Sequence, residues 1–118
     1  MNDTNHSDFD RLREKLIDRG LTGEHSLPVM ARGSEDPGEG YFAEMKEDLK
    51  ALFDALGDSK TIDRTLAAAL YGIGHHAYVN FEASIHHGRK YRETLVDPDL
   101  IDLEMAVDSI FTGEWVTL

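Results

Sequence analysis

The sequence contains no cysteine among its 118 residues, which excludes disulfide bonds, a thiol nucleophile and thiolate metal ligands. Basic residues are also scarce, because 12 lysines and arginines stand against 23 acids, and the formal net charge is −11. A chain this acidic is a poor partner for nucleic acid or an anionic membrane, and a good partner for a basic protein surface. The first 20 residues lack the apolar core of a signal peptide, so we expect a cytoplasmic protein.

Charge is almost absent from residues 59–88, where Glu82 is the one formal charge between Arg64 and Arg89. The uncharged run 65–81 is close to the lower length limit of a membrane span, but it holds two histidines, an asparagine and two glycines. These polar groups favour a buried helix of a soluble protein. The pattern predicts one central helix over 59–88, capped by Ser59 or Thr61 and ended by Gly88.

Three further helices follow from apolar periodicity and end signals. They are expected over 7–20, with Ser7 as cap and Gly20 as end; over 41–57, ended by Gly57; and from Asp97, with Pro98 in the first helical position. The short link after Gly57 predicts that helix 41–57 pairs antiparallel with the central helix. Residues 21–40 lack periodicity and are rich in glycine and proline, which indicates a long loop. Residues 1–6 are expected to be disordered.

The fold class that these segments predict is all-α. We expect residues 1–118 to form a single domain, a bundle of about four helices with a long first connection. The small residues of the central helix, Gly72 and Gly74 among them, would let a neighbouring backbone approach closely.

His75, Glu82 and His86 share one stripe of the central helix, because offsets of seven and eleven residues return to nearly the same direction. Two imidazoles and a carboxylate could bind zinc, iron or manganese, with His76 or His87 as a further ligand. However, His75 lies roughly 10 Å along the axis from Glu82. This spread favours a hydrogen-bonded structural stripe, so we predict no bound metal and no other cofactor.

The C-terminal part of the chain has a strong charge bias, since residues 97–118 hold six acids and no base. The one dense basic group, Arg89, Lys90 and Arg92, is too small to neutralise all of them. We therefore predict a partner-binding surface on the last helix, with an aromatic anchor in a tail that docks on the bundle. Its residues are Asp97, Asp99, Asp102, Glu104, Asp108 and Trp115.

Two segments, ALYGIGHHA at 69–77 and IDLEMAVDSIFTGEW at 101–115, are similar to parts of small acidic immunity proteins that bacteria pair with secreted toxins, including those of contact-dependent inhibition. The resemblance covers about a fifth of the chain. It implies a cytosolic protein without enzymatic activity, whose partner is a dedicated toxin domain, often a basic nuclease. No catalytic motif opposes this, since Ser84 lacks the glycine turn of a nucleophilic serine.

Three hypotheses therefore remain open. The first is an interaction module that covers a basic surface of another protein. The second is a metal-binding helical protein that uses His75, Glu82 and His86. The third is an oligomer subunit in which the small residues of the central helix pair with a second copy.

Overall fold

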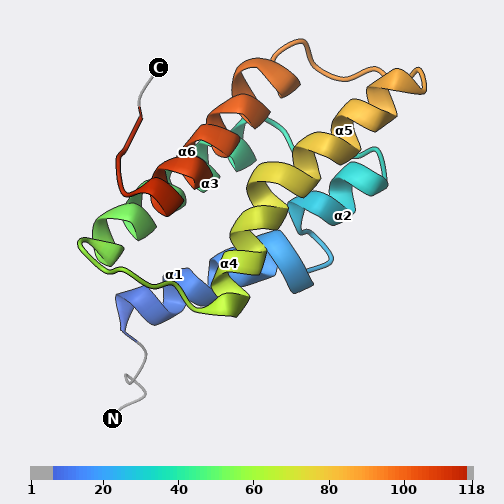
Figure 1. The fold of residues 1–118 in the computed structure, drawn as a ribbon. Helices are drawn as coiled ribbons and strands as arrows, with labels where there is room; N and C mark the ends of the chain where they lie inside the picture. The colour runs from blue at the N-terminus through green and yellow to red at the C-terminus, as the bar shows by residue number, and fades with distance from the viewer. Residues whose placement is uncertain (1–6, 117–118) are drawn as a thin grey trace.

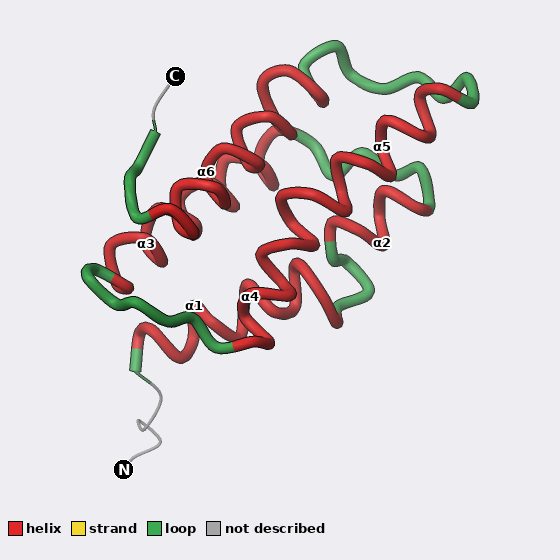
Figure 2. Tube along the Cα trace, viewed as in Figure 1, coloured by secondary structure: helices red, strands yellow, loops and turns green. Residues whose placement is uncertain are grey.

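Every regular element is a helix in the computed structural model, which describes residues 7–116 (Figures 1 and 2). The elements in chain order are α1 (Asp8–Ile17), η2 (Asp18–Thr22), α2 (Leu27–Arg32), α3 (Glu39–Leu56), α4 (Arg64–Tyr71), η3 (Gly72–His76), α5 (Ala77–His86), η4 (Leu95–Leu100) and α6 (Ile101–Thr112), where η denotes a π-helical segment. Several elements are continuous, so the described chain forms four long helices and the short α2. The predicted all-α bundle of about four helices is confirmed. Residues 1–6, predicted to be disordered, lie outside the described residues.

The central helix α4–η3–α5 crosses the molecule and contacts most other elements (Figure 1). The helix α1 lies against α4, α2 lies against α5, and η3 packs on α6, which also packs along α3. The predicted pairing of α3 with the central helix is therefore wrong, because α3 packs mainly on α6 and α1. The reason lies in the link: Asp63, and not Ser59 or Thr61, caps α4, so residues 57–63 stay non-helical and carry the chain away from α3.

The predicted loop 21–40 is wrong in part, because α2 occupies its middle. Ser26 accepts a hydrogen bond from the Val29 N–H at 3.4 Å and so caps the helix, with Pro28 in the first turn. Leu27 and Met30 are buried against the core, whereas Val29 is exposed. A helix of six residues is too short to show apolar periodicity, so only the serine and proline signals were available in the sequence.

Glycines allow close backbone contact where η2 meets the central helix. A Cβ atom on Gly20 would lie 2.1 Å from the carbonyl oxygen of Ala69, and one on Gly72 would lie 2.1 Å from that of Gly20. Gly74 similarly approaches the side chain of Val107 on α6. The expectation that small residues admit a neighbouring backbone is confirmed. The predicted end of the first helix at Gly20 is wrong, because Gly20 lies inside η2, which continues to Thr22.

This contact also bears on the oligomer hypothesis. Ala69, Gly72 and Gly74 are buried within the chain by η2 and α6. The buried part of the small-residue surface is therefore not available for pairing with a second copy.

The start of α4 is fixed by Asp63. Its carboxylate accepts a hydrogen bond from the Leu66 N–H at 2.9 Å and receives a two-pronged contact from Arg13 of α1, at 2.8 and 3.0 Å. The hydrogen bonds from Arg13 and from the backbone lower the pKa of Asp63 from 3.8 to about 2. A lowered pKa means that the folded state favours the charged form, so the stabilisation is present above pH 4 and is lost as the pH falls toward 2.

Replacing Asp63 tests this assignment. Asp63→Ala is expected to lower the free energy of unfolding by about 1 kcal/mol at pH 7 through loss of the cap. Asp63→Asn keeps a capping oxygen and should lose less, because the side chain is 43% exposed and water screens its charge. Urea unfolding of wild type and Asp63→Asn at several pH values should show a difference that becomes much smaller as the pH falls from 4 to 2. A difference of the same size at pH 7 and pH 2 would contradict the role of the charge.

Candidate partner-binding surface

The first of the predicted acids, Asp97, lies in η4 and is exposed. Its backbone is extended, with φ −126° and ψ 111°, and Pro98 opens the turn that leads into α6. Asp97 forms no ion pair with any of the described residues, so its charge is available to a partner.

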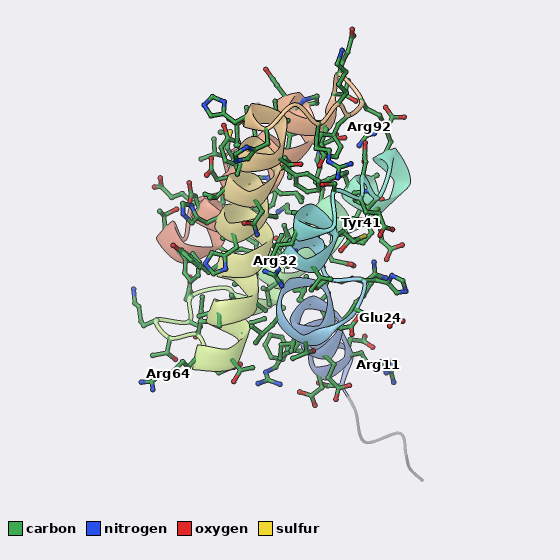
Figure 3. All side chains as sticks on the ribbon, turned by 90° about the vertical axis from the view of Figure 1, so that its right-hand side faces the viewer. Arg11, Glu24, Arg32, Tyr41, Arg64 and Arg92 are labelled. Carbon is green, nitrogen blue, oxygen red and sulfur yellow. The ribbon has the colours of Figure 1, made fainter. Side chains whose placement is uncertain are left out.

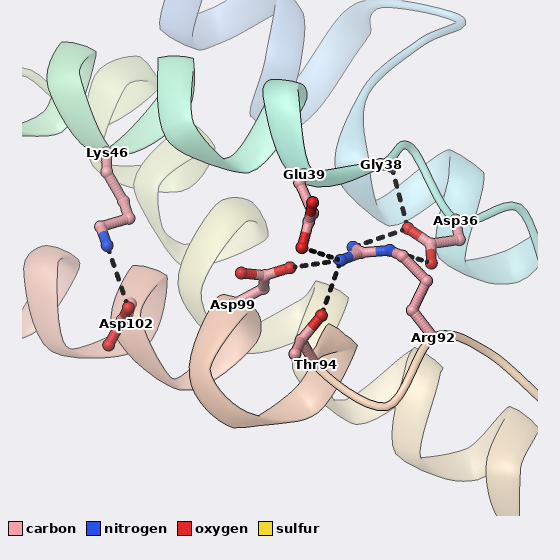
Figure 4. A network of polar contacts seen from close by, with 8 residues as sticks. All are labelled: Asp36, Gly38, Glu39, Lys46, Arg92, Thr94, Asp99 and Asp102. Atoms are coloured by element: carbon pink, nitrogen blue, oxygen red, sulfur yellow. Dashed lines mark hydrogen bonds and ion pairs between the residues drawn. The ribbon is translucent and has the colours of Figure 1, made fainter.

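Asp99, unlike Asp97, belongs to an ion-pair network centred on Arg92 (Figure 4). Arg92 Nη1 lies 2.9 Å from Asp99 Oδ2, and the same guanidinium donates to both oxygens of Asp36, at 2.7 and 3.0 Å. It also donates to Thr94 Oγ1 at 2.9 Å. The close approach of the guanidinium neutralises the Asp99 carboxylate. Asp99 is therefore an internal ion-pair partner rather than a free surface charge.

Burial and hydrogen bonding set the charge state of this network. Only 28% of the Arg92 side chain, 18% of Asp36 and 15% of Asp99 is exposed, so the network counts as mostly buried. Burial alone would raise the pKa of Asp36, but the hydrogen bonds from Arg92 and from the Gly38 N–H lower it below its ordinary value. The hydrogen bond to Asp36 in turn raises the pKa of Arg92. Both shifts favour the charged forms of Asp36 and Arg92.

Asp102 is neutralised by Lys46 of α3, with 3.0 Å between Nζ and Oδ2 (Figure 4). The sequence suggested Arg89, Lys90 and Arg92 as the group that neutralises the C-terminal acids. Of these three, only Arg92 forms an ion pair with one of them, Asp99. Arg89 and Lys90 have no acidic partner in the part of the chain that the structure describes. The pairs 36–92 and 46–102 each join residues that are 56 apart in the chain, and no local pattern could have revealed them.

Glu104 and Asp108, one turn apart on α6, have no cation partner within residues 7–116. Across from them, Tyr78 of α5 donates a hydrogen bond to Glu82 at 3.2 Å. Burial, the charge of Glu82, that hydrogen bond and the charge of Glu104 together raise the pKa of Tyr78. Glu82 and Glu104 therefore act on the same phenol from two different helices. We call Glu82, Glu104 and Asp108 the α5–α6 acidic surface.

Trp115 lies in the C-terminal segment that follows α6 and is half-buried against Phe53 of α3. The ring centroids are 5.3 Å apart, and the Lys50 ammonium lies 5.3 Å from the indole centroid. The Val116 N–H donates to Ser109 Oγ at 2.9 Å and fixes the segment beside α6. The predicted docking of the tail is thus confirmed as far as Val116. Because the indole ring of Trp115 packs against Phe53 and Lys50, we do not include Trp115 in the α5–α6 acidic surface.

The stripe His75, Glu82 and His86 is not gathered into one site. His75 packs against the ring of Tyr71, with centroids 4.9 Å apart, and Glu82 bonds to Tyr78. Among residues 7–116 no group of three histidine or acidic side chains is arranged to hold a metal ion. The π-helical segment η3 displays His75 and His76 to solvent instead.

Comparisons with protein-family models, with curated proteins and with solved structures found no match. No helix in the described part of the chain has both the length and the apolar character needed to cross a membrane.

Proposed function

We propose that this protein is an interaction module that covers a basic functional surface of another protein, as an immunity protein covers its toxin. One observation carries the proposal: Glu104 and Asp108 lie one turn apart on α6 without a cation partner among residues 7–116, and Glu82 of α5 acts with Glu104 on the same Tyr78 phenol. Asp99 and Asp102 form ion pairs within the fold, so the proposed binding surface contains fewer of the C-terminal acids than the sequence predicts.

The uncompensated charge has a physical cost that a partner would remove. Like charges one turn apart on a helix repel each other and destabilise it slightly. The excess over the whole chain, −11, repels in the same way. A basic partner would offset this repulsion and would be drawn to the surface over several ångströms, which speeds the encounter. The metal-binding hypothesis has no comparable support from the described side chains.

Charge reversal tests the proposal. We expect Glu104→Lys/Asp108→Lys to slow association with the partner about tenfold at low salt, and to leave helicity and melting temperature close to wild type. The partner is first captured from the native host with the wild-type protein and identified by mass spectrometry. Stopped-flow mixing then measures association, and growth of cells that express the partner with and without this protein measures neutralisation.

A matched control is available on α1. Asp10→Lys/Glu14→Lys makes the same change of charge at the same spacing, and neither residue forms an ion pair with another residue of the range 7–116. This variant should associate almost as fast as wild type. Salt should slow wild-type association far more than it speeds dissociation, because exposed charges are screened within about 8 Å at physiological ionic strength. Equal rates at low and high salt, or full activity of the α6 variant, would contradict the proposal.

A further inference from the structure

A second candidate site lies between α2 and α5, apart from the α5–α6 acidic surface. It is a cavity of about 430 Å³ that is wide open to solvent, and its basic residues Arg32, His87 and Arg89 are exposed. Its polar lining comes from Arg32, Ser34, Asn80, Ser84, His87 and Arg89. In a chain with a net charge of −11, this gathering of cations and neutral donors without an acid is unexpected.

Three hydroxyl groups form a chain that runs from Tyr91 to two residues of the cavity lining, Ser84 and Ser34. Tyr91 OH lies 2.7 Å from Ser84 Oγ, and Ser84 Oγ lies 3.2 Å from Ser34 Oγ. The three groups carry three protons, and the two hydrogen bonds use two of them. When the phenol donates to Ser84 and Ser84 donates to Ser34, the proton of Ser34 is left over. The chain then ends in an unused O–H donor on a residue that lines the cavity.

Arg32 ends α2 and Arg89 lies in the segment after α5, and both line this cavity. Neither has an ion-pair partner in residues 7–116. The nearest acid in sequence, Glu35, lines another cavity. The ends of α2 and α5 do not need the two guanidinium groups either, because backbone N–H groups already cap the carbonyls there. The Gly33 N–H donates to Val29, and the N–H groups of His87 and Arg89 donate to Ser84.

Ser34 adopts a backbone conformation that a residue with a side chain rarely takes, since its φ is +60°. Glycine or asparagine is usual at such a position, and a serine there costs some stability. The serine hydroxyl has a partner in Ser84, which is consistent with a role for the side chain at this position.

We propose that this cavity binds a small molecule through a phosphate or carboxylate group. The two guanidinium groups supply paired N–H donors that match an oxyanion, and the hydroxyl of Ser34 supplies a neutral donor beside them. Asn80 and the remaining volume accommodate the rest of the ligand. The site is independent of the proposed function, since it shares no residue with the α5–α6 acidic surface.

Titration of the full-length protein with defined anions tests the site. We expect saturable binding of inorganic phosphate, glycerol phosphate or succinate, with a Kd of about 1 mM or lower for the best of them. Calorimetry gives the affinity, and shifts of the amide signals of residues 32–34 and 84–89 in NMR spectra place it. Tighter binding of glycerol phosphate identifies a phosphate ester as the ligand class, and tighter binding of succinate identifies a carboxylic acid. Sodium chloride at equal ionic strength is the reference.

Variants separate specific binding from general attraction. Arg89→Gln and Arg32→Gln should each weaken binding about tenfold. Ser34→Gly should weaken it several-fold and leave the fold intact or more stable, because glycine accepts a positive φ without strain. Arg64→Gln is the matched control, since this arginine also lacks an ion-pair partner in residues 7–116 and lies well apart from Arg32 (Figure 3). Absence of saturable binding for all three anions, or equal loss in the Arg64 and Arg89 variants, would overturn the proposal.

Discussion

Replacing Gly72 with alanine is expected to lower the free energy of unfolding by about 3 kcal/mol, the largest effect of any single change that we predict. The added Cβ atom would lie 2.1 Å from the carbonyl oxygen of Gly20 and 3.3 Å from the ring of Pro28. A backbone oxygen cannot turn aside as a long side chain can, so η2 and the central helix would have to separate. Urea unfolding followed by circular dichroism measures the change.

The control for this variant is Gly40→Ala, another glycine-to-alanine change inside a helix. Nothing lies within 4 Å of the position of the new Cβ atom. This change should be neutral or should stabilise the protein by up to about 1 kcal/mol, because alanine favours the helix. Equal stability of the Gly72 and Gly40 variants would show that η2 and the central helix are not in backbone contact.

Arg92→Leu is expected to lower the free energy of unfolding by about 2–3 kcal/mol. The change removes the cation from between Asp36 and Asp99 and leaves two mostly buried carboxylates without a counter-charge. Those carboxylates belong to the segment before α3 and to η4, so the variant should loosen both. Hydrogen exchange of the amides in residues 34–40 and 93–99 should rise along with the loss of stability.

Two further variants test whether the loss of stability in Arg92→Leu comes from lost hydrogen bonds or from lost charge. Arg92→Lys should recover only part of the loss, because an ammonium group cannot donate to both oxygens of Asp36 and also reach Asp99 in the fixed geometry of the guanidinium. Lys90→Leu removes a charge two residues away that has no partner in the described chain, and it should change stability by less than about 0.5 kcal/mol. Full recovery by lysine would indicate that net charge, and not hydrogen-bond geometry, holds the segment.

The two proposed sites make opposite demands on charge. The α5–α6 acidic surface attracts cations, whereas the cavity between α2 and α5 is proposed to bind an anion against the field of a chain with a net charge of −11. An anion can bind in this cavity only through hydrogen-bond donors that contact it directly. Arg32 and Arg89 can serve as such donors only if no acid of the chain is paired with them. The charge reversal on α6 and the Ser34 and Arg89 variants test the two sites separately.

The four long helices could be predicted from the sequence, because apolar periodicity and end signals depend on neighbours within one or two turns, whereas the short α2 and the exact ends near Gly20 and Asp63 could not. Ser7 caps α1 by accepting from the Asp10 N–H at 3.1 Å, and Gly57, Gly88 and Gly113 take positive φ where helices end. The apolar line of the central helix follows from the same local spacing. Leu66, Leu70, Ile73, Ala77 and Phe81 are buried and Ile62 is partly buried.

Which acids lack a cation partner could be seen only in the folded structure, because an ion pair depends on distance in space rather than in the chain. Asp97, Asp99, Asp102, Glu104 and Asp108 are equivalent in sequence, yet Arg92 and Lys46 neutralise two of them from other elements. The same holds for the cavity, where Arg32 and Ser34 meet Ser84 and Arg89 after a separation of about 50 residues. Helix periodicity is local and can be read from the chain, whereas the partners of a charge are set by how the helices pack.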